Sequence, residues 1–142
     1  MRELMLYLHF IGLGLAVGTG FSMMNLGIAT KNLSPAEKGA FFLKAFSLSM
    51  NGNIGFALLI LSGTALIFID GPKATFAASG GFFHAKLVMV VVLAGLIGYM
   101  HTLMAKAKRE NGGPVMLKIA KMGPFTLGTG LIIVLLAVLS FH

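Results

Sequence analysis

Three ionisable side chains lie within long apolar stretches of this 142-residue sequence, namely His9, His84 and Lys86. An ionisable group is costly to place in hydrocarbon, so such a residue is a functional candidate wherever its segment spans a membrane. A histidine ring nitrogen can bind a metal ion, and a lysine can neutralise an acidic group. The chemistry open to these three residues is therefore metal ligation beside an anionic group.

The composition predicts that membrane-spanning helices position these side chains. Apolar residues make up 57% of the chain and charged residues 11%, with a mean hydropathy of +0.93. A soluble domain usually has about a quarter of its residues charged. The absence of cysteine excludes disulfides, thiolate metal sites and cysteine nucleophiles. We interpret the net charge of +7 as a topology signal rather than as a nucleic-acid surface.

Four apolar segments are long enough to span a bilayer, which takes roughly 20 residues. They predict helices at about 4–29, 41–69, 82–107 and 115–141, within one transmembrane domain of residues 1–142. Ser34-Pro35-Ala36-Glu37 is typical of a helix start, and Asp70-Gly71-Pro72 of a helix end. The predicted fold is an all-α, up-down, integral membrane four-helix bundle.

The distribution of lysine and arginine predicts the orientation of this bundle. The termini and the second loop contain Arg2 and Lys73. The first and third loops with their flanks contain eight cations: Lys31, Lys38, Lys44, Lys106, Lys108, Arg109, Lys118 and Lys121. Positively charged loops face the cytoplasm. We therefore expect both termini on the outer (periplasmic) side of a bacterial cytoplasmic (inner) membrane.

The two histidines lie at similar depths in the first and third apolar segments. His9 is about five residues into its segment and His84 about two, which agree within about one helical turn. The first and third helices of a simple up-down bundle are diagonal neighbours that run the same way. Two imidazoles facing each other there suit haem b, with a methionine as the alternative second ligand. Histidines at headgroup level, bonded to water or backbone, are the other interpretation.

Small residues follow His9 on one helical stripe, at Gly12, Ala16 and Gly20. This row predicts a slot for a flat cofactor beneath the histidine. Close helix packing is the other interpretation of the glycines, and Gly14 with Gly18 forms a small-xxx-small pair typical of it. Glycines also recur in the later segments, at Gly95, Gly98, Gly128 and Gly130.

The residues around the histidines resemble a known family. The run Phe83-His84-Ala85-Lys86-Leu87, followed by an apolar stretch, Tyr99, His101 and a basic turn, is similar to the third helix of the HemJ-type protoporphyrinogen oxidases. Leu8-His9-Phe10-Ile11-Gly12 is similar to their first helix, and CopD-like small membrane proteins share this general style. The resemblance implies a bundle of this size, a haem b, His9 as a ligand, and His84 and Lys86 at the haem or substrate site.

The leading hypothesis is therefore a haem-b-binding membrane redox protein, in which His9 and His84 bind the iron or the porphyrin. It would oxidise a porphyrinogen, or pass electrons between a quinone-like donor and a partner subunit. Lys86 would meet a porphyrin propionate, or extend to the outer interface. Two alternatives stay open. One is a non-catalytic subunit that assembles with other membrane subunits or with itself, and the other is a copper-handling protein of CopD type.

Overall fold

The computed structural model describes residues 1–78 and 80–140, and this part of the chain is helical without any strand. Four of its helices are long and apolar enough to cross a membrane when α2, η1 and α3 are taken as one, which indicates an integral membrane protein. The elements are α1 (Arg2–Ala29), α2 (Pro35–Ala45), the short 3₁₀ helix η1 (Phe46–Leu48), α3 (Ser49–Asp70), α4 (Pro72–Ala78), α5 (Gly80–Arg109) and α6 (Val115–Leu139).

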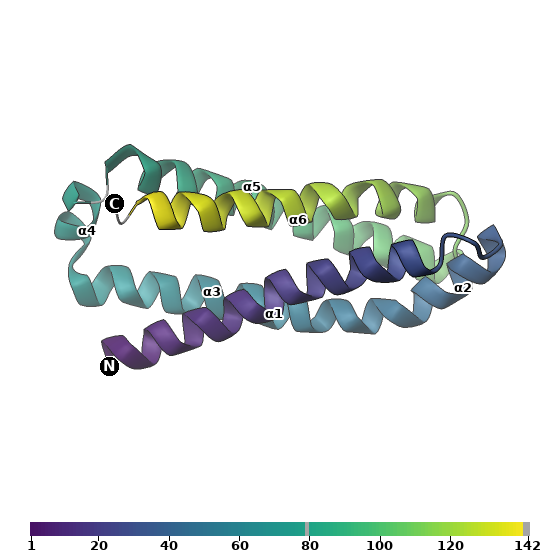
Figure 1. The fold of residues 1–142 in the computed structure, drawn as a ribbon, viewed down its shortest axis with the longest axis horizontal. Helices are drawn as coiled ribbons and strands as arrows, with labels where there is room; N and C mark the ends of the chain where they lie inside the picture. The colour runs from purple at the N-terminus through teal and green to yellow at the C-terminus, as the bar shows by residue number, and fades with distance from the viewer. Residues whose placement is uncertain (79, 141–142) are drawn as a thin grey trace.

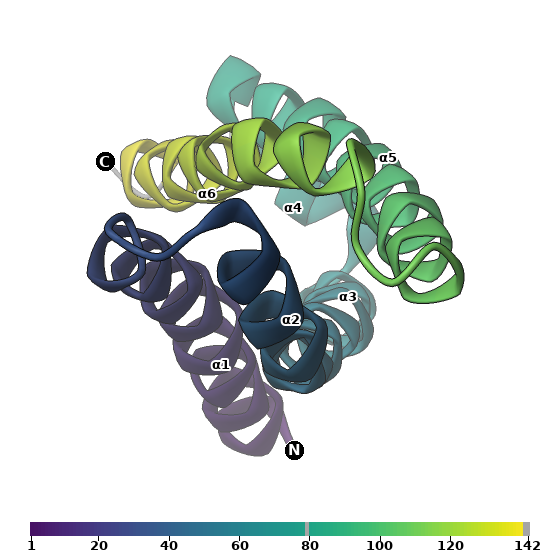
Figure 2. The same cartoon turned by 90° about the vertical axis from the view of Figure 1, so that its right-hand side faces the viewer.

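The long helices pack as two pairs. Helix α1 packs mainly against α3, and α5 packs mainly against α6. Contacts between α1 and α6 join the two pairs, and Figure 2 shows the four long helices end-on in this arrangement. Neither α1 and α5 nor α3 and α5 form a main packing pair. The prediction of an all-helical chain with four membrane-length helices is confirmed.

Local sequence signals set the helix ends as predicted. At the start of α2, the Glu37 backbone N–H donates to Ser34 Oγ (3.3 Å) and the Ser34 N–H donates to Glu37 Oε2 (3.0 Å), with Pro35 at the first helical position. This capping box satisfies backbone donors that the first turn leaves free. Helix α3 ends at Gly71, whose φ of 88° is a left-handed conformation that glycine adopts without a Cβ penalty.

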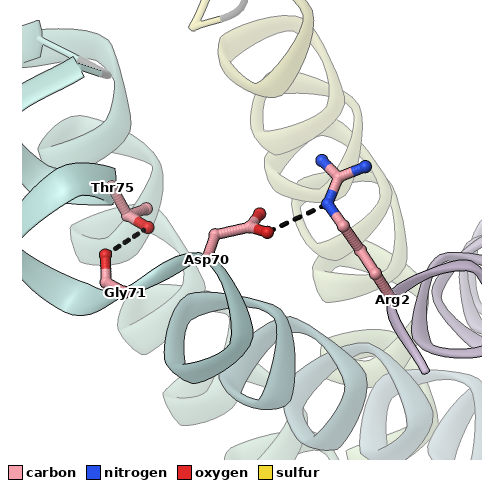
Figure 3. Close-up of polar contacts among 4 residues, drawn as sticks. All are labelled: Arg2, Asp70, Gly71 and Thr75. Carbon is pink, nitrogen blue, oxygen red and sulfur yellow. Dashed lines mark hydrogen bonds and ion pairs between the residues drawn. The ribbon is translucent and has the colours of Figure 1, made fainter.

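Some boundaries differ from the prediction. The second apolar segment begins earlier than residue 41, because α2 and η1 form a bent lead-in to α3. The segment after Gly71, predicted only as a helix stop, forms the short helix α4, whose Thr75 Oγ1 donates to the Gly71 carbonyl oxygen at 3.0 Å (Figure 3). The predicted end of the fourth helix at residue 141 lies outside the described residues.

The main buried cluster lies at one end of the bundle, where η1 meets the α5–α6 hairpin. It consists of Phe46, Leu103, Ala107, Val115 and Ile119. The same end carries α2 and the turns after α1 and α5, whereas Met1 and the end of α6 lie at the opposite end (Figure 1). Along the rest of the bundle large apolar side chains are exposed, including Phe68, Val91 and Phe125. Such a surface suits contact with lipid acyl chains.

Candidate functional site

His9 forms a hydrogen bond across the α1–α3 interface. Its Nδ1 lies 2.9 Å from Ser62 Oγ, and Ser62 is buried while His9 is half-buried. The imidazole also lies against Gly63, where an added Cβ would be 3.3 Å from His9 Cε1. The glycine on α3 thus leaves room for the ring of His9. Ser62 could not be recognised from the sequence, because its role depends on how α3 is aligned against α1.

The hydrogen bonds of Ser62 determine which nitrogen of His9 carries the proton. The Ser62 hydroxyl donates to the Leu58 carbonyl oxygen at 2.5 Å, so its single proton is already used. Ser62 Oγ must therefore accept from His9 Nδ1–H. This assignment leaves the Nε2 lone pair of His9 free, and an imidazole held through Nδ1 by a second group is the usual state of a metal-ligating histidine.

Lys86 lies on α5, two residues after His84. Lys86 is half-buried, and its Nζ lies 5.9 Å from the centroid of the Phe83 ring. Within residues 1–78 and 80–140 the ion pairs are Arg2–Asp70 and Lys106–Glu110, and neither includes Lys86. Lys86 thus offers a cation without a carboxylate partner in the described chain.

His84 lies at the start of α5 and is exposed. Its Nδ1 donates to the Gly80 carbonyl oxygen at 3.1 Å, and its ring centroid is 5.4 Å from that of Phe76 on α4. The bond through Nδ1 leaves Nε2 free here as well. No hydrogen bond or ring contact in the described part of the chain joins His84 to His9. The structure thus places them on diagonal helices without bringing their rings together.

The predicted slot beneath His9 is filled by neighbouring helices. A Cβ atom at Gly12 would lie 2.8 Å from the Gly55 carbonyl oxygen, and one at Gly20 would lie 2.7 Å from Leu127 Cδ1. A Cβ atom at Gly55 would lie 2.6 Å from the Ala16 backbone nitrogen. The small-residue row was therefore wrongly interpreted as a cofactor slot. It allows α3 and α6 to approach α1 closely, which is the packing interpretation.

The small-xxx-small pair on α1 does not pack within the chain. Added Cβ atoms at Gly14 and Gly18 would meet nothing within 4 Å. Both glycines line a shallow groove of about 230 Å³ whose other walls are Leu15, Thr19, Ser22, Leu48 and Asn51. Added Cβ atoms would also meet nothing within 4 Å at Gly95, Gly98, Gly128 and Gly130. These glycines leave parts of the bundle surface flat instead of bringing its own helices together.

A second histidine link lies towards the other end of the bundle. His101 on α5 donates from Nε2 to Asn53 Oδ1 on α3, at 3.0 Å. This bond crosses between the two helix pairs, where α3 and α5 have few backbone contacts. Polar side chains that bond across helices help to hold membrane bundles together. We therefore assign His101 a structural role.

The described side chains include two imidazoles and a lysine in membrane-length helices, but no cluster of metal ligands. The described residues contain no group of three or more histidine, cysteine or acidic side chains that could hold a metal ion. This gives no support to the copper-handling alternative. Haem needs one or two axial donors, and it gains from a cation near its propionates. His9, His84 and Lys86 are residues of these types, but the structure does not bring the two imidazoles together and packs helices where a slot beneath His9 was expected.

Comparisons of the chain with models of protein families, with curated proteins and with solved structures gave no match. The similarity to the HemJ-type proteins therefore rests on the two short motifs that contain His9 and His84.

Proposed function

We propose that the protein is a haem-b-binding redox protein of a bacterial inner membrane, with His9 as an axial ligand. The observation that carries the proposal is the chain of hydrogen bonds from His9 Nδ1 through Ser62 Oγ to the Leu58 carbonyl oxygen. It fixes the imidazole between two helices and leaves the Nε2 lone pair available to a metal ion. A histidine that binds a metal ion through one ring nitrogen usually donates a hydrogen bond from the other nitrogen, and this bond orients the ring.

The other two residues have defined roles in this proposal. His84 supplies the second imidazole, with a methionine as the alternative, and Lys86 holds a propionate by charge. When bound, haem supplies one-electron redox chemistry whose potential depends on its axial ligands and burial. The substrates proposed are a porphyrinogen or a quinone-like electron donor, as the similarity to the HemJ-type oxidases implies.

Haem content measured chemically in the purified full-length protein tests this proposal. Cells are supplied with a haem precursor, and haem per chain is compared between the wild type, Lys86→Gln and Lys86→Arg. We expect close to one haem per chain in the wild type, less in Lys86→Gln, and recovery in Lys86→Arg, because arginine keeps the charge. Wild-type protein that is folded but contains no haem would contradict the proposal.

A second candidate function is supported by the groove at Gly14 and Gly18. Small exposed residues on a membrane helix allow another helix to approach closely. Asn51 at the edge of this groove is exposed, and its side chain forms no hydrogen bond in the described part of the chain. In this alternative the protein assembles through α1 with a second copy or with another membrane subunit.

Cysteine cross-linking in native membranes tests the second candidate cleanly, because the chain has no cysteine of its own. Gly18→Cys lies in the groove, and Gly95→Cys is a matched control at another open glycine. A disulfide-linked dimer formed by Gly18→Cys alone would support pairing of two copies through α1. Equal cross-linking at both positions would indicate random collision.

A further inference from the structure

A single stripe on α6 combines two lysines with an apolar groove. Lys118 and Lys121 lie in the first turns of the helix, and both are exposed. Phe125, Gly128 and Ile132 continue the same stripe at intervals of three or four residues, which places them on one face of the helix. The two lysines therefore lie at one end of the stripe, and Phe125, Gly128 and Ile132 extend it along the membrane-spanning part of α6.

The groove runs along one face of α6, since all of its lining residues belong to that helix. It has a volume of about 300 Å³ and is lined by Pro124, Phe125, Gly128, Thr129 and Ile132. A Cβ atom at Gly128 would meet nothing within 4 Å, so the missing side chain helps to keep the groove open. From Pro124 to Ile132 the helix rises about 12 Å, close to the depth of one hydrocarbon leaflet of about 15 Å.

The two lysines have no acidic partner in the described part of the chain. Its ion pairs involve Arg2 with Asp70 and Lys106 with Glu110. The other acid at this end of the bundle, Glu37, accepts hydrogen bonds from Ser34 in the capping box. Lys118 and Lys121 thus carry positive charge at headgroup level without an internal counter-ion.

We propose that this stripe of α6 is a binding site for an anionic phospholipid. The phosphate lies against Lys118 and Lys121, and one acyl chain lies in the groove between Pro124 and Ile132. Charge complementarity selects an anionic headgroup, because juxtamembrane lysines are attracted to anionic lipids. The groove selects a ligand with a chain, which distinguishes a bound lipid from a free anion. This site is independent of the histidines and of any haem.

Native mass spectrometry of the full-length protein in detergent, titrated with palmitoyl-oleoyl phosphatidylglycerol or phosphatidylcholine, tests the proposal. The wild type should bind phosphatidylglycerol with a clear preference. Lys118→Gln with Lys121→Gln should lower its occupancy roughly tenfold or more, since each cation near an anionic surface contributes. The matched control, Lys108→Gln with Arg109→Gln, removes the same charge from the same end and should have a much smaller effect.

A second variant tests the groove separately from the charge. Gly128→Leu should fill the groove, and its Cβ atom would meet nothing within 4 Å. We expect it to leave folding intact and to weaken phosphatidylglycerol binding. Gly95→Leu on α5 is the control for an added leucine at an open glycine. If both double variants lose phosphatidylglycerol binding equally, the lipid is attracted only by the net charge of the protein. If Gly128→Leu leaves phosphatidylglycerol binding unchanged, the groove does not hold the acyl chain. Equal loss in the two double variants, or unchanged binding in Gly128→Leu, overturns the proposal.

Discussion

Gly12 and Gly55 face each other across the α1–α3 interface. A Cβ atom on Gly12 would lie 2.8 Å from the Gly55 carbonyl oxygen, and one on Gly55 would lie 2.7 Å from that of Gly12. The obstacle on each side is backbone, which a rotamer change cannot move. This close approach sets the distance between the two helices that carry His9 and Ser62.

Gly12→Ala or Gly55→Ala should therefore destabilise the bundle. Forcing an extra methyl group into a packed interface usually costs about 1–3 kcal/mol. Reversible unfolding in mixed micelles, followed by circular dichroism, would measure the loss. Gly14→Ala is the matched control on the same helix, because nothing lies within 4 Å of its added Cβ. Its effect should stay within about 0.5 kcal/mol, and equal losses at Gly12 and Gly14 would refute this account of the interface.

Ser62→Ala should weaken the support of His9. It removes the acceptor of the Nδ1 proton and leaves a half-buried donor without a partner, which costs about 1–3 kcal/mol. If His9 binds haem iron, loss of the group that orients the imidazole should also lower haem affinity by about 10–100-fold. A haem titration of the apoprotein would measure this change. Thr64→Ala, an exposed hydroxyl on the same helix, should leave the affinity unchanged.

Asn53→Ala should loosen the contact between α3 and α5, because it removes the acceptor of the His101 hydrogen bond. Interhelical hydrogen bonds in membrane proteins contribute about 0.6 kcal/mol on average. Asn51→Ala, two residues earlier on α3, removes no hydrogen bond within the described chain and is the control. A double-mutant cycle of Asn53→Ala with His101→Ala would measure the coupling. Strictly additive effects would argue against a contribution from this bond.

The ion pair at the start of α1 should contribute little to stability. Arg2 Nε donates to Asp70 Oδ1 at 2.9 Å, and both side chains are largely exposed (Figure 3). Exposed pairs typically contribute about 0.2–1 kcal/mol and weaken as salt rises. Arg2→Gln should therefore lower the unfolding free energy by less than about 1 kcal/mol. The difference from wild type should shrink in high salt, and a salt-independent loss would assign Arg2 another role.

The membrane helices and their ends could be predicted because the signals are local. An apolar run of sufficient length, a capping box at Ser34 and a glycine before proline at residue 71 each act within a few residues. Helix α4 was not predicted, because Pro72–Ala78 is too short and too mixed in composition to show a clear period. Local composition alone does not separate such a segment from a turn.

The candidate site could be predicted only in part. His9, His84 and Lys86 stand out because ionisable residues are rare in apolar segments. The partner Ser62 depends on the alignment of two antiparallel helices, which also pairs Arg2 with Asp70 near their ends. The sequence places Gly12 and Gly14 on different stripes of small residues but does not show which stripe meets α3, and in the structure Gly12 is packed while Gly14 is open. Which face of a helix meets its neighbour is a property of the whole bundle.

The dithionite-reduced minus oxidised visible spectrum shows directly whether the protein binds haem b through His9. The full-length protein is purified from cells supplied with haem, together with His9→Ala, His84→Ala and, as a control, His101→Ala, whose imidazole already bonds Asn53. We expect a b-type α-band in the wild type that is kept in His101→Ala, lost in His9→Ala and weakened or lost in His84→Ala. A wild-type spectrum without that band, or the same band in His9→Ala, would refute haem binding through His9.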